Sequence, residues 1–421
     1  MTERSPARHV VLAYSGGLDT SVAIRWIAEQ YHAEVTALTI DVGQEGELVG
    51  ALDRAKRNGA RDAILKDAKR PFVEQFLWPA LKANALYEGI YPLSTALARP
   101  LIAKTLGEAA VTLGADAVAH GCTGKGNDQV RFDVALQTLT PQLRIIAPVR
   151  EWNMNRSDEI RYAQTHGIEI RATHDSPYSV DENLWGRSIE GGRLEDPDEA
   201  APEEVFDWTG HPETWPRTPE EIEVTFEAGV PTALDGEALG PVELVRRMNQ
   251  RAGAHGIGRI DHVEDRVVGI KSRETYECPG AIALLEAHRA LETLVLTREV
   301  LQFKAGVDRR FADLVYEGGW FSPLRESLSA FVDATQSVVS GTVTLRCFQG
   351  SARAVGRRSE HSLVSHELAT YGTADAFPSE YAVGFIHLYG LPNRLAYAKR
   401  STGAGAAPDD GRAARSVPHR A

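Results

Sequence analysis

Short apolar runs alternate with amphipathic stretches over the first 170 or so residues of the chain. Residues 10–13 and 35–42 are continuous apolar or β-branched runs of strand length. Residues 72–86 and 97–113 repeat apolar side chains at helical spacing, and residues 115–119 read as a further short strand. This alternation predicts an α/β fold, a parallel sheet with helices on both faces. Ligands of such sheets bind beyond the carboxyl ends of the strands, so one site is expected there.

The pattern changes near residue 173. Residues 191–221 are rich in Glu, Asp and Pro, and we expect them to cross the surface as a long connection. Residues 222–226 alternate and are followed by an Asp-Gly turn, which predicts a β-hairpin. The later pattern predicts helices, then a strand, then a last helical stretch: 241–251, 280–302 and 324–338, then 342–348, then 379–399.

These patterns divide the chain into five segments. A length of 421 residues exceeds what one small core organises, so two large domains are expected. The segments are a flexible N-terminus (1–8), an α/β domain (9–172), a larger α+β domain (173–375), a C-terminal helix (376–400) and a disordered tail (401–421).

Composition narrows the class of protein. A hydrophobic fraction of 43% and a charged fraction of 25% are typical of a soluble globular chain. The net charge of −12 argues against a nucleic-acid partner, because phosphate backbones bind basic surfaces. The three cysteines are far apart, and no signal peptide or bilayer-length apolar run is visible. We therefore expect a cytoplasmic protein with no membrane partner and no metal site of its own.

The most informative motif is Ala-Tyr-Ser-Gly-Gly-Leu-Asp-Thr-Ser at residues 13–21. It joins a buried strand to a helix through a Gly-Gly turn, which directs backbone N–H groups and a helix N-terminus at one place. Gly16 and Gly17 allow the backbone to approach a ligand closely, and Ser15, Thr20 and Ser21 add hydroxyl groups. No Gly-Lys-Ser/Thr ends the motif, so it is a phosphate loop of another kind than Walker A. An ordinary capped turn is the alternative.

A second polar loop, residues 121–132, follows the strand expected at 115–119. Its glycines free the backbone, and Lys125 and Arg131 contribute positive charge. Asp128 can hold a substrate ammonium group, and Arg131 can bind a carboxylate through two donors. The alternative is a solvated Gly-rich turn. Two such loops at the strand ends of one sheet indicate a binding site more strongly than either loop alone.

Together the two motifs resemble the signatures of the argininosuccinate synthase family, a branch of the ATP pyrophosphatases of N type. The first resembles its Ala-Tyr-Ser-Gly-Gly-Leu-Asp-Thr-Ser signature, and the second its Gly-x-Thr-x-Lys-Gly-Asn-Asp-x-x-Arg-Phe signature. Further likeness runs through residues 98–104, 147–152 and 269–273 and covers nearly all of residues 9–399.

The resemblance implies that residues 9–172 form the ATP pyrophosphatase nucleotide-binding domain and that residues 173–375 form the synthetase domain, which binds substrate and joins subunits. It also implies roles for individual residues. ATP would be held by residues Ala13, Tyr14, Ser15, Gly16, Gly17, Leu18, Asp19, Thr20, Ser21, Ile40 and Gly121. Aspartate would be held by Thr123, Asn127 and Asp128. Citrulline would be held by Tyr91, Asn127, Arg131, Ser179, Ser188, Glu264 and Tyr276. Taken alone, the two tyrosines would be packing residues, Glu264 part of an acidic turn, and the two serines ordinary loop residues.

Four residues are the candidate catalytic groups: Asp19, Arg99, Lys104 and Asp128. Arg99 and Lys104 are either cations near the phosphates or surface charges. One position departs from the family pattern, because Ala96 stands where a serine that contacts citrulline is usual. Ser94 and Thr95 are the two candidates to replace that hydroxyl.

The implied reaction is an AMP-forming carbon–nitrogen ligation in arginine biosynthesis and the urea cycle. ATP would adenylate the ureido oxygen of citrulline, pyrophosphate would leave, and the aspartate amine would displace AMP. The implied cofactors are ATP and the Mg²⁺ carried with it, and the implied assembly is a homotetramer. Two alternatives are another pyrophosphate-loop ligase, including a tRNA-modifying relative, and a nucleotide sensor without chemistry. The second polar loop and the large C-terminal half argue against the sensor.

Overall fold

The computed structural model describes residues 7–46, 48–124, 126–152, 154–170, 177–370 and 376–403. Its first half is built on a parallel sheet with the strand order β3-β2-β1-β4-β5. These strands are β1 (His9–Ala13), β2 (Glu34–Asp41), β3 (Asp62–Asp67), β4 (Ala117–Ala119) and β5 (Arg144–Ile146). β1 is central, and pairs Val10 with Val35 of β2 and with Ala117 of β4. The carboxyl ends of β1 and β4 therefore lie side by side.

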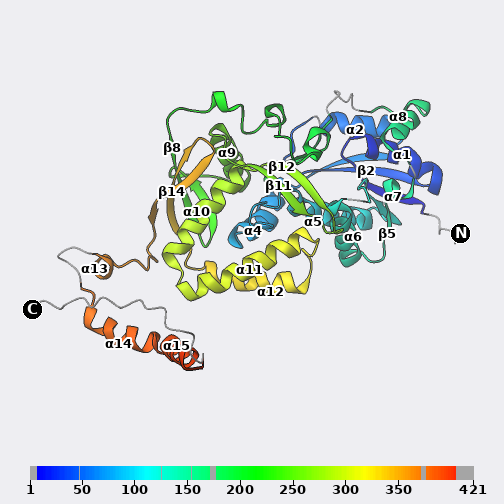
Figure 1. Cartoon of the computed structure of the whole chain (residues 1–421). Helices are drawn as coiled ribbons and strands as arrows, with labels where there is room; N and C mark the ends of the chain where they lie inside the picture. Colours follow the sequence, from blue (N-terminus) through cyan, green and yellow to red (C-terminus); the bar gives the residue numbers. More distant parts are fainter. Residues whose placement is uncertain are drawn as a thin grey trace, which may run out of the picture. The chain divides into compact units, whose positions relative to one another are not determined.

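Helices cover both faces of this sheet, as Figure 1 shows, which confirms the predicted α/β fold. Val10 and Leu12 of β1 belong to the core formed with α1, α2 and α8, whereas Val11 belongs to the core formed with α5 and α6. Because successive strand residues face opposite ways, a buried run of this kind needs cover on both sides. The helices are α1 (Leu18–Tyr31), α2 (Leu48–Arg57), α5 (Ser94–Thr112), α6 (Asn127–Leu139), α7 (Pro148–Glu151) and α8 (Arg156–Thr165).

The stretch predicted as one helix over residues 72–86 is three short pieces. They are α3 (Lys69–Phe72), a π-helical segment (Val73–Leu77) and α4 (Trp78–Lys82). Pro79 lies just inside α4, where its missing N–H costs least, and Ala83 leaves the helical conformation. The apolar spacing was correct, because Phe72, Phe76, Leu77 and Leu81 are all buried.

Two antiparallel sheets follow. One has the order β11-β12-β7-β6, and the other has the order β10-β9-β8-β13-β14. Their strands are β6 (Ser179–Asn183), β7 (Gly186–Glu190), β8 (Glu220–Glu227), β9 (Val230–Leu234), β10 (Glu237–Ala238), β11 (Arg259–Asp265), β12 (Lys271–Glu277), β13 (Gly341–Phe348) and β14 (Ser351–Arg358). The predicted hairpin is β8–β9. Short 3-10 turns at Gly192–Glu195, Glu203–Val205 and Pro212–Thr214 punctuate the long connection before it.

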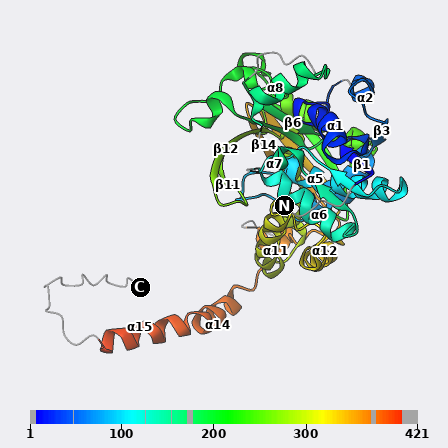
Figure 2. The same ribbon diagram turned by 90° about the vertical axis from the view of Figure 1, so that its right-hand side faces the viewer.

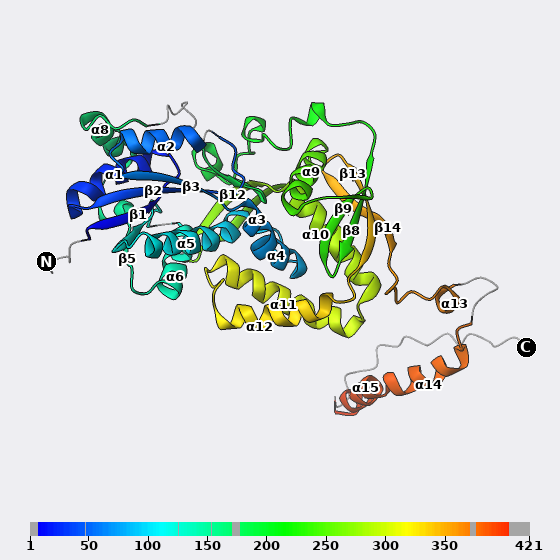
Figure 3. The same cartoon turned by 180° about the vertical axis from the view of Figure 1, so that it is seen from behind.

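The remaining helices of this unit are α9 (Pro241–Ala254), α10 (Pro279–Val295), α11 (Arg298–Tyr316) and α12 (Pro323–Gln336). Figure 3 shows α11 and α12 side by side. The single helix expected over 280–302 is therefore wrong. Leu296 is extended and Thr297 caps α11, accepting a hydrogen bond from the Val300 N–H at 3.5 Å. An N-cap threonine starts a new helix even where the apolar spacing continues.

The chain separates into two compact units, residues up to Leu363 and residues from Val364. Phe132 and Leu184 belong to one continuous core, so residues from both predicted segments, 9–172 and 173–375, pack together in the first unit. That unit ends at Leu363, short of the boundary predicted at residue 375. The second unit contains α13 (His366–Ala369), α14 (Ser379–Tyr389) and α15 (Leu391–Gly403), and Figure 2 shows α14 and α15 in succession.

Two expectations for the chain ends meet the structure only in part. One helix was expected at 376–400, but Gly390 separates two, and residues 401–403 continue α15 rather than starting a disordered tail. The expectations for residues 1–6 and 404–421 lie outside the described residues. Among the helices described, none is both long enough and apolar enough to cross a bilayer.

Candidate active site

A cavity of about 1180 Å³ opens at the carboxyl ends of β1, β2 and β4 and extends to β6, β7, β11 and β12. Every predicted site residue except Ser21 and Lys104 lines it. Ser21 is buried behind the loop, with its Oγ 3.1 Å from the Tyr14 hydroxyl. Lys104 pairs with Glu108 one turn along α5, with Nζ 2.6 Å from Oε1, and does not reach the cavity. Lys125 lies outside the described residues.

The first loop has the geometry of an anion site. Gly17 is the N-cap residue of α1, and Gly16 has a left-handed φ of +78°. Ser15 Oγ accepts from the Gly17 N–H at 3.3 Å and lies 3.1 Å from Thr20 Oγ1. A methyl group on Gly121 would lie only 2.9 Å from Thr20 Cγ2, so the two predicted loops touch each other. The loop amides, the two hydroxyls and the helix N-terminus all converge on one end of the cavity.

Asp19, in the first turn of α1, has an acidic neighbour that the sequence did not indicate. Burial first, and then the hydrogen bonding and charge of Asp19, raise the pKa of Glu159 to about 8. Glu159 is 5% exposed, and its Oε2 has no hydrogen-bond partner among the described residues. At neutral pH Glu159 therefore keeps its proton beside the phosphate loop.

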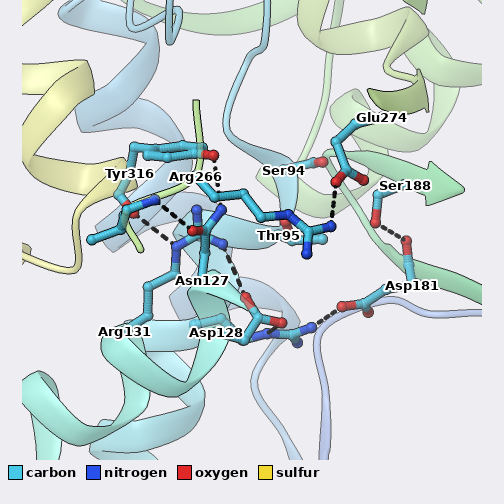
Figure 4. A network of polar contacts seen from close by, with 12 residues as sticks. Ser94, Thr95, Asn127, Asp128, Arg131, Asp181, Ser188, Arg266, Glu274 and Tyr316 are labelled. Carbon is cyan, nitrogen blue, oxygen red and sulfur yellow. Dashed lines mark hydrogen bonds and ion pairs between the residues drawn. The ribbon is translucent and has the colours of Figure 1, made fainter. Parts of the chain in front are cut away.

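The second loop leads into α6, whose first turn carries a charged cluster (Figure 4). Asp128 accepts from Arg99 Nε at 2.8 Å and from Arg131 Nη1 at 2.9 Å, and Arg99 also pairs with Asp181. Burial opposes ionisation of Asp128, but the two guanidinium groups hold its pKa below the usual value. Asp128 is therefore an ionised carboxylate fixed between two arginines.

Arg131 is 3% exposed and already has partners on two of its three nitrogens. Its Nε donates to the Tyr316 carbonyl at 2.9 Å, and its guanidinium carbon lies 4.8 Å from the centre of the Tyr316 ring. Its Nη2 is buried without a hydrogen-bond partner among the described residues. The two-donor clamp inferred from sequence is thus partly occupied by the protein, and Nη2 is the donor left for a ligand.

A stack of tyrosines forms another wall. The rings of Tyr91 and Tyr276 lie 4.1 Å apart between centroids. Glu264 accepts from the Tyr276 hydroxyl at 2.7 Å and from the Tyr316 hydroxyl at 2.5 Å. Asn127 donates to the Tyr316 hydroxyl at 2.8 Å and accepts from the Val267 N–H at 2.9 Å. These contacts fix carboxylate, amide and phenol groups from four elements around one space.

The alternative interpretations as loop and turn residues are wrong for three residues. Ser179 and Ser188 lie on the strands β6 and β7, and Glu264 lies on β11. Three polar residues of this wall, Glu190, Arg266 and Glu274, were not predicted. Arg266 donates to Glu274 at 2.7 Å and to Glu190 at 2.8 Å. Glu190 follows Ser188 by two positions, so the strand alternation of β7 would have placed both on one face.

The fold and the cavity together indicate a nucleotide-binding α/β protein. In it, a loop suited to an anion and a polar pocket suited to an amino acid open into the same cavity. Residues 9–169 match the N-terminal HUP domain of arginosuccinate synthase, and residues 178–396 match its C-terminal domain. The chain belongs to the argininosuccinate synthase family, which confirms the resemblance found in the sequence. Membership makes it an enzyme, a ligase of arginine biosynthesis that uses ATP.

Several named relatives are similar over nearly their whole length. The argininosuccinate synthase of Dehalococcoides mccartyi is 53% identical over 386 residues, covering 92% of this chain and 95% of that protein. Those of Rubrobacter xylanophilus and Bacillus pumilus are each 54% identical, covering 92% and 93% of this chain and 94% and 97% of theirs.

Proposed function

We propose that this enzyme condenses citrulline with aspartate at the expense of ATP, forming argininosuccinate, AMP and pyrophosphate through citrullyl-AMP. One observation carries the proposal: a single cavity joins the phosphate loop at residues 14–20 to the polar cluster of Asn127, Asp128, Arg131 and Glu264. ATP and two amino acids each need a different part of such a space. Catalysis would rest on positioning and on neutralising phosphate charge.

ATP occupies the end of the cavity nearest α1 in this proposal. Residues 13–20, Ile40 and Gly121 would contact it, and Ser21 would act indirectly by holding Tyr14. The ureido oxygen of citrulline attacks the α-phosphorus, and pyrophosphate leaves into the loop amides. Mg²⁺ would enter with ATP, held mainly by phosphate oxygens and water. Asp19 is the one residue of the loop at 13–21 that contributes a carboxylate group.

Aspartate would bind at Thr123, Asn127 and Asp128, beside the ATP loop. Asp128 carries an ionised carboxylate whose remaining lone pairs can accept from an ammonium group. Arg99 would act as a positioning residue, because its Nε fixes one oxygen of Asp128. The amine of aspartate then attacks the activated carbon and displaces AMP. We do not assign a catalytic role to Lys104, which pairs with Glu108 outside the cavity.

Citrulline would bind between the tyrosine wall and α6. Arg131 Nη2 and Glu264 supply opposite charges for its carboxylate and ammonium groups, with Tyr91, Asn127, Ser179, Ser188 and Tyr276 around them. Thr95 is the better replacement for the hydroxyl missing at Ala96. Its Oγ1 lies 2.7 Å from the Tyr91 hydroxyl and it lines the cavity, whereas Ser94 is fully buried.

We further propose that the enzyme works in the cytoplasm as a homotetramer, without a nucleic-acid or membrane partner. Support for assembly comes from α14, in which no residue is buried. Its large apolar side chains Tyr381, Phe385 and Leu388 are 64–73% exposed. Large apolar side chains gathered on one helix are typical of an interaction surface.

The test is a ligand-dependence assay with the full chain. Pyrophosphate and argininosuccinate are followed with ATP and citrulline, ATP and aspartate, or all three. We expect argininosuccinate only with all three substrates. Citrulline labelled with heavy oxygen in its ureido group should give labelled AMP, because that oxygen becomes bonded to the α-phosphorus. ADP with label in free phosphate would contradict adenylation and the role of the first loop.

A further inference from the structure

Arg54 of α2 lines the cavity at the phosphate loop, although neither motif contains it. Its Nε is buried and has no hydrogen-bond partner among the described residues, and no ion pair to a carboxylate is found for it there. Arg57, three residues further along α2, is the contrast. It binds Glu169 through Nε at 2.5 Å and through Nη2 at 3.1 Å. A buried donor without a partner requires an explanation, and a ligand supplies one.

The Arg54 guanidinium lies directly beside the loop backbone. A methyl group built on Gly16 would lie 3.2 Å from Arg54 Nη2 and 3.2 Å from Cβ of Ala51. Gly16 therefore does two things: it adopts a φ of +78°, and it leaves room for the guanidinium. The N–H groups of the loop, the N-terminus of α1 and the Arg54 side chain meet at one end of the cavity.

We propose that Arg54 binds the terminal phosphates of ATP and then the departing pyrophosphate. This inference rests on the proposed function and deepens it. The guanidinium is planar and stays charged at every accessible pH, and its parallel donors match two phosphate oxygens. Negative charge accumulates on the pyrophosphate as the bond between the α-phosphorus and the bridging oxygen breaks. A fixed cation at this place therefore stabilises the departing group more than the bound substrate.

The experiment compares Arg54→Ala, Arg54→Lys and Arg57→Ala in the full-length enzyme. The affinity for magnesium pyrophosphate and for AMP is measured by calorimetry, which does not require turnover. Loss of a charge-assisted contact predicts pyrophosphate binding about 10- to 100-fold weaker in Arg54→Ala. AMP binding should be unchanged, because AMP lacks the two terminal phosphates. Arg54→Lys should recover part of the affinity, and Arg57→Ala should bind like the wild type.

Two results would overturn the inference: pyrophosphate affinity unchanged in Arg54→Ala, or AMP and pyrophosphate weakened equally, which would indicate a general distortion of the loop. Failure of the proposed function has a different signature. In that case the wild type would release no pyrophosphate in response to citrulline and aspartate, while the calorimetric comparison would still report on Arg54.

Discussion

Arg131 shows how a single residue can be correctly located by sequence and incompletely described by it. The motif placed a guanidinium in the site, and the cavity contains it. What the motif could not show is that Asp128 and the Tyr316 carbonyl already take two of its nitrogens. Tyr316 ends a helix almost two hundred residues away in sequence, and no local pattern links the two. Contacts across the fold, rather than residue identity, decide which donor remains free.

Replacing Arg131 with Lys should weaken citrulline far more than ATP. A lysine keeps the charge but loses the contact with the Tyr316 carbonyl and the Nη2 donor. We expect the KM for citrulline to rise about 10- to 100-fold, as for the loss of one charged contact. Arg150→Lys is the control, because Arg150 pairs with Asp133 and does not line the cavity. Steady-state kinetics decide, and an unchanged KM for citrulline would remove Arg131 from that subsite.

Titration of Glu159 makes the free energy of unfolding of the enzyme depend on pH. The pKa is 4.5 in the unfolded chain and is raised to about 8 in the fold. Below pH 4.5 both states are protonated, so folding carries no penalty. Between these values the unfolded chain has released its proton and the folded chain has not, so stability falls as pH rises. Above pH 8 the folded state must hold the carboxylate beside Asp19.

Glu159→Gln should therefore gain stability relative to the wild type as pH increases. The amide is neutral at every pH and still has donors for Asp19. We expect the difference in Tm between variant and wild type to grow in favour of the variant from pH 5 to pH 8.5. Thermal unfolding at several pH values measures it. A difference that does not change with pH would mean that Glu159 does not titrate in this window.

At the level of elements, the loop between β2 and α2 depends on the β6–β7 hairpin. The Leu184 N–H donates to the Val42 carbonyl at 3.0 Å, and Glu182 accepts from the Glu45 N–H. Gly43 has a φ of +94°, and a methyl group there would lie 2.3 Å from Leu184 Cγ. The hairpin thus holds a loop that lines the end of the cavity proposed to bind ATP.

Gly43→Ala should both destabilise the protein and raise the KM for ATP. Overpacking against Leu184 costs about 1–3 kcal/mol in addition to the strained φ. Gly46→Ala is the matched control, since Gly46 has a φ of +132° but nothing within 4 Å of its added methyl. The double variant with Leu184→Ala should lose less stability than the sum of the two single variants, because removing the Leu184 side chain relieves the clash. Equal Tm values for the two single variants would show that the Leu184 contact does not matter.

The sequence predicted helices and strands correctly where a run of consecutive residues is buried. It missed strands, or misplaced the ends of helices, where polar residues determine the structure. The strands β1, β2 and β4 followed from apolar runs such as 35–42, whereas β3, which has no fully buried residue, was not predicted. The β6–β7 and β11–β12 hairpins were missed, because their charged residues are satisfied by partners in other elements. Arg187 on β7, for example, binds the fully buried Glu277 on β12 at 2.5 Å. In the sequence alone, the two charged residues of such a buried pair look like exposed surface residues.

For the whole molecule, the two-part site was predictable because both motifs follow strands of one parallel sheet. The Arg54 contact was not, because α2 carries no motif and only the packing of Ala51 against Gly16 brings it near. The second unit is the reverse case. Its apolar residues are evident in the sequence, but nothing within residues 379–403 buries them. Their cover must come from other surfaces, and the proposed assembly provides it.

The side chains of Tyr381, Phe385 and Leu388 are four and three residues apart, and so share one face of α14. Replacing Phe385 and Leu388 with Ser should reduce the molar mass in solution from that of the proposed tetramer to that of smaller species, because the apolar contact area between copies is lost. Removing residues 404–421, which are poor in large apolar side chains, is the control and should leave the mass unchanged. Light scattering after size-exclusion chromatography measures both proteins. A Ser variant with the full tetramer mass would show that this face of α14 does not join the subunits.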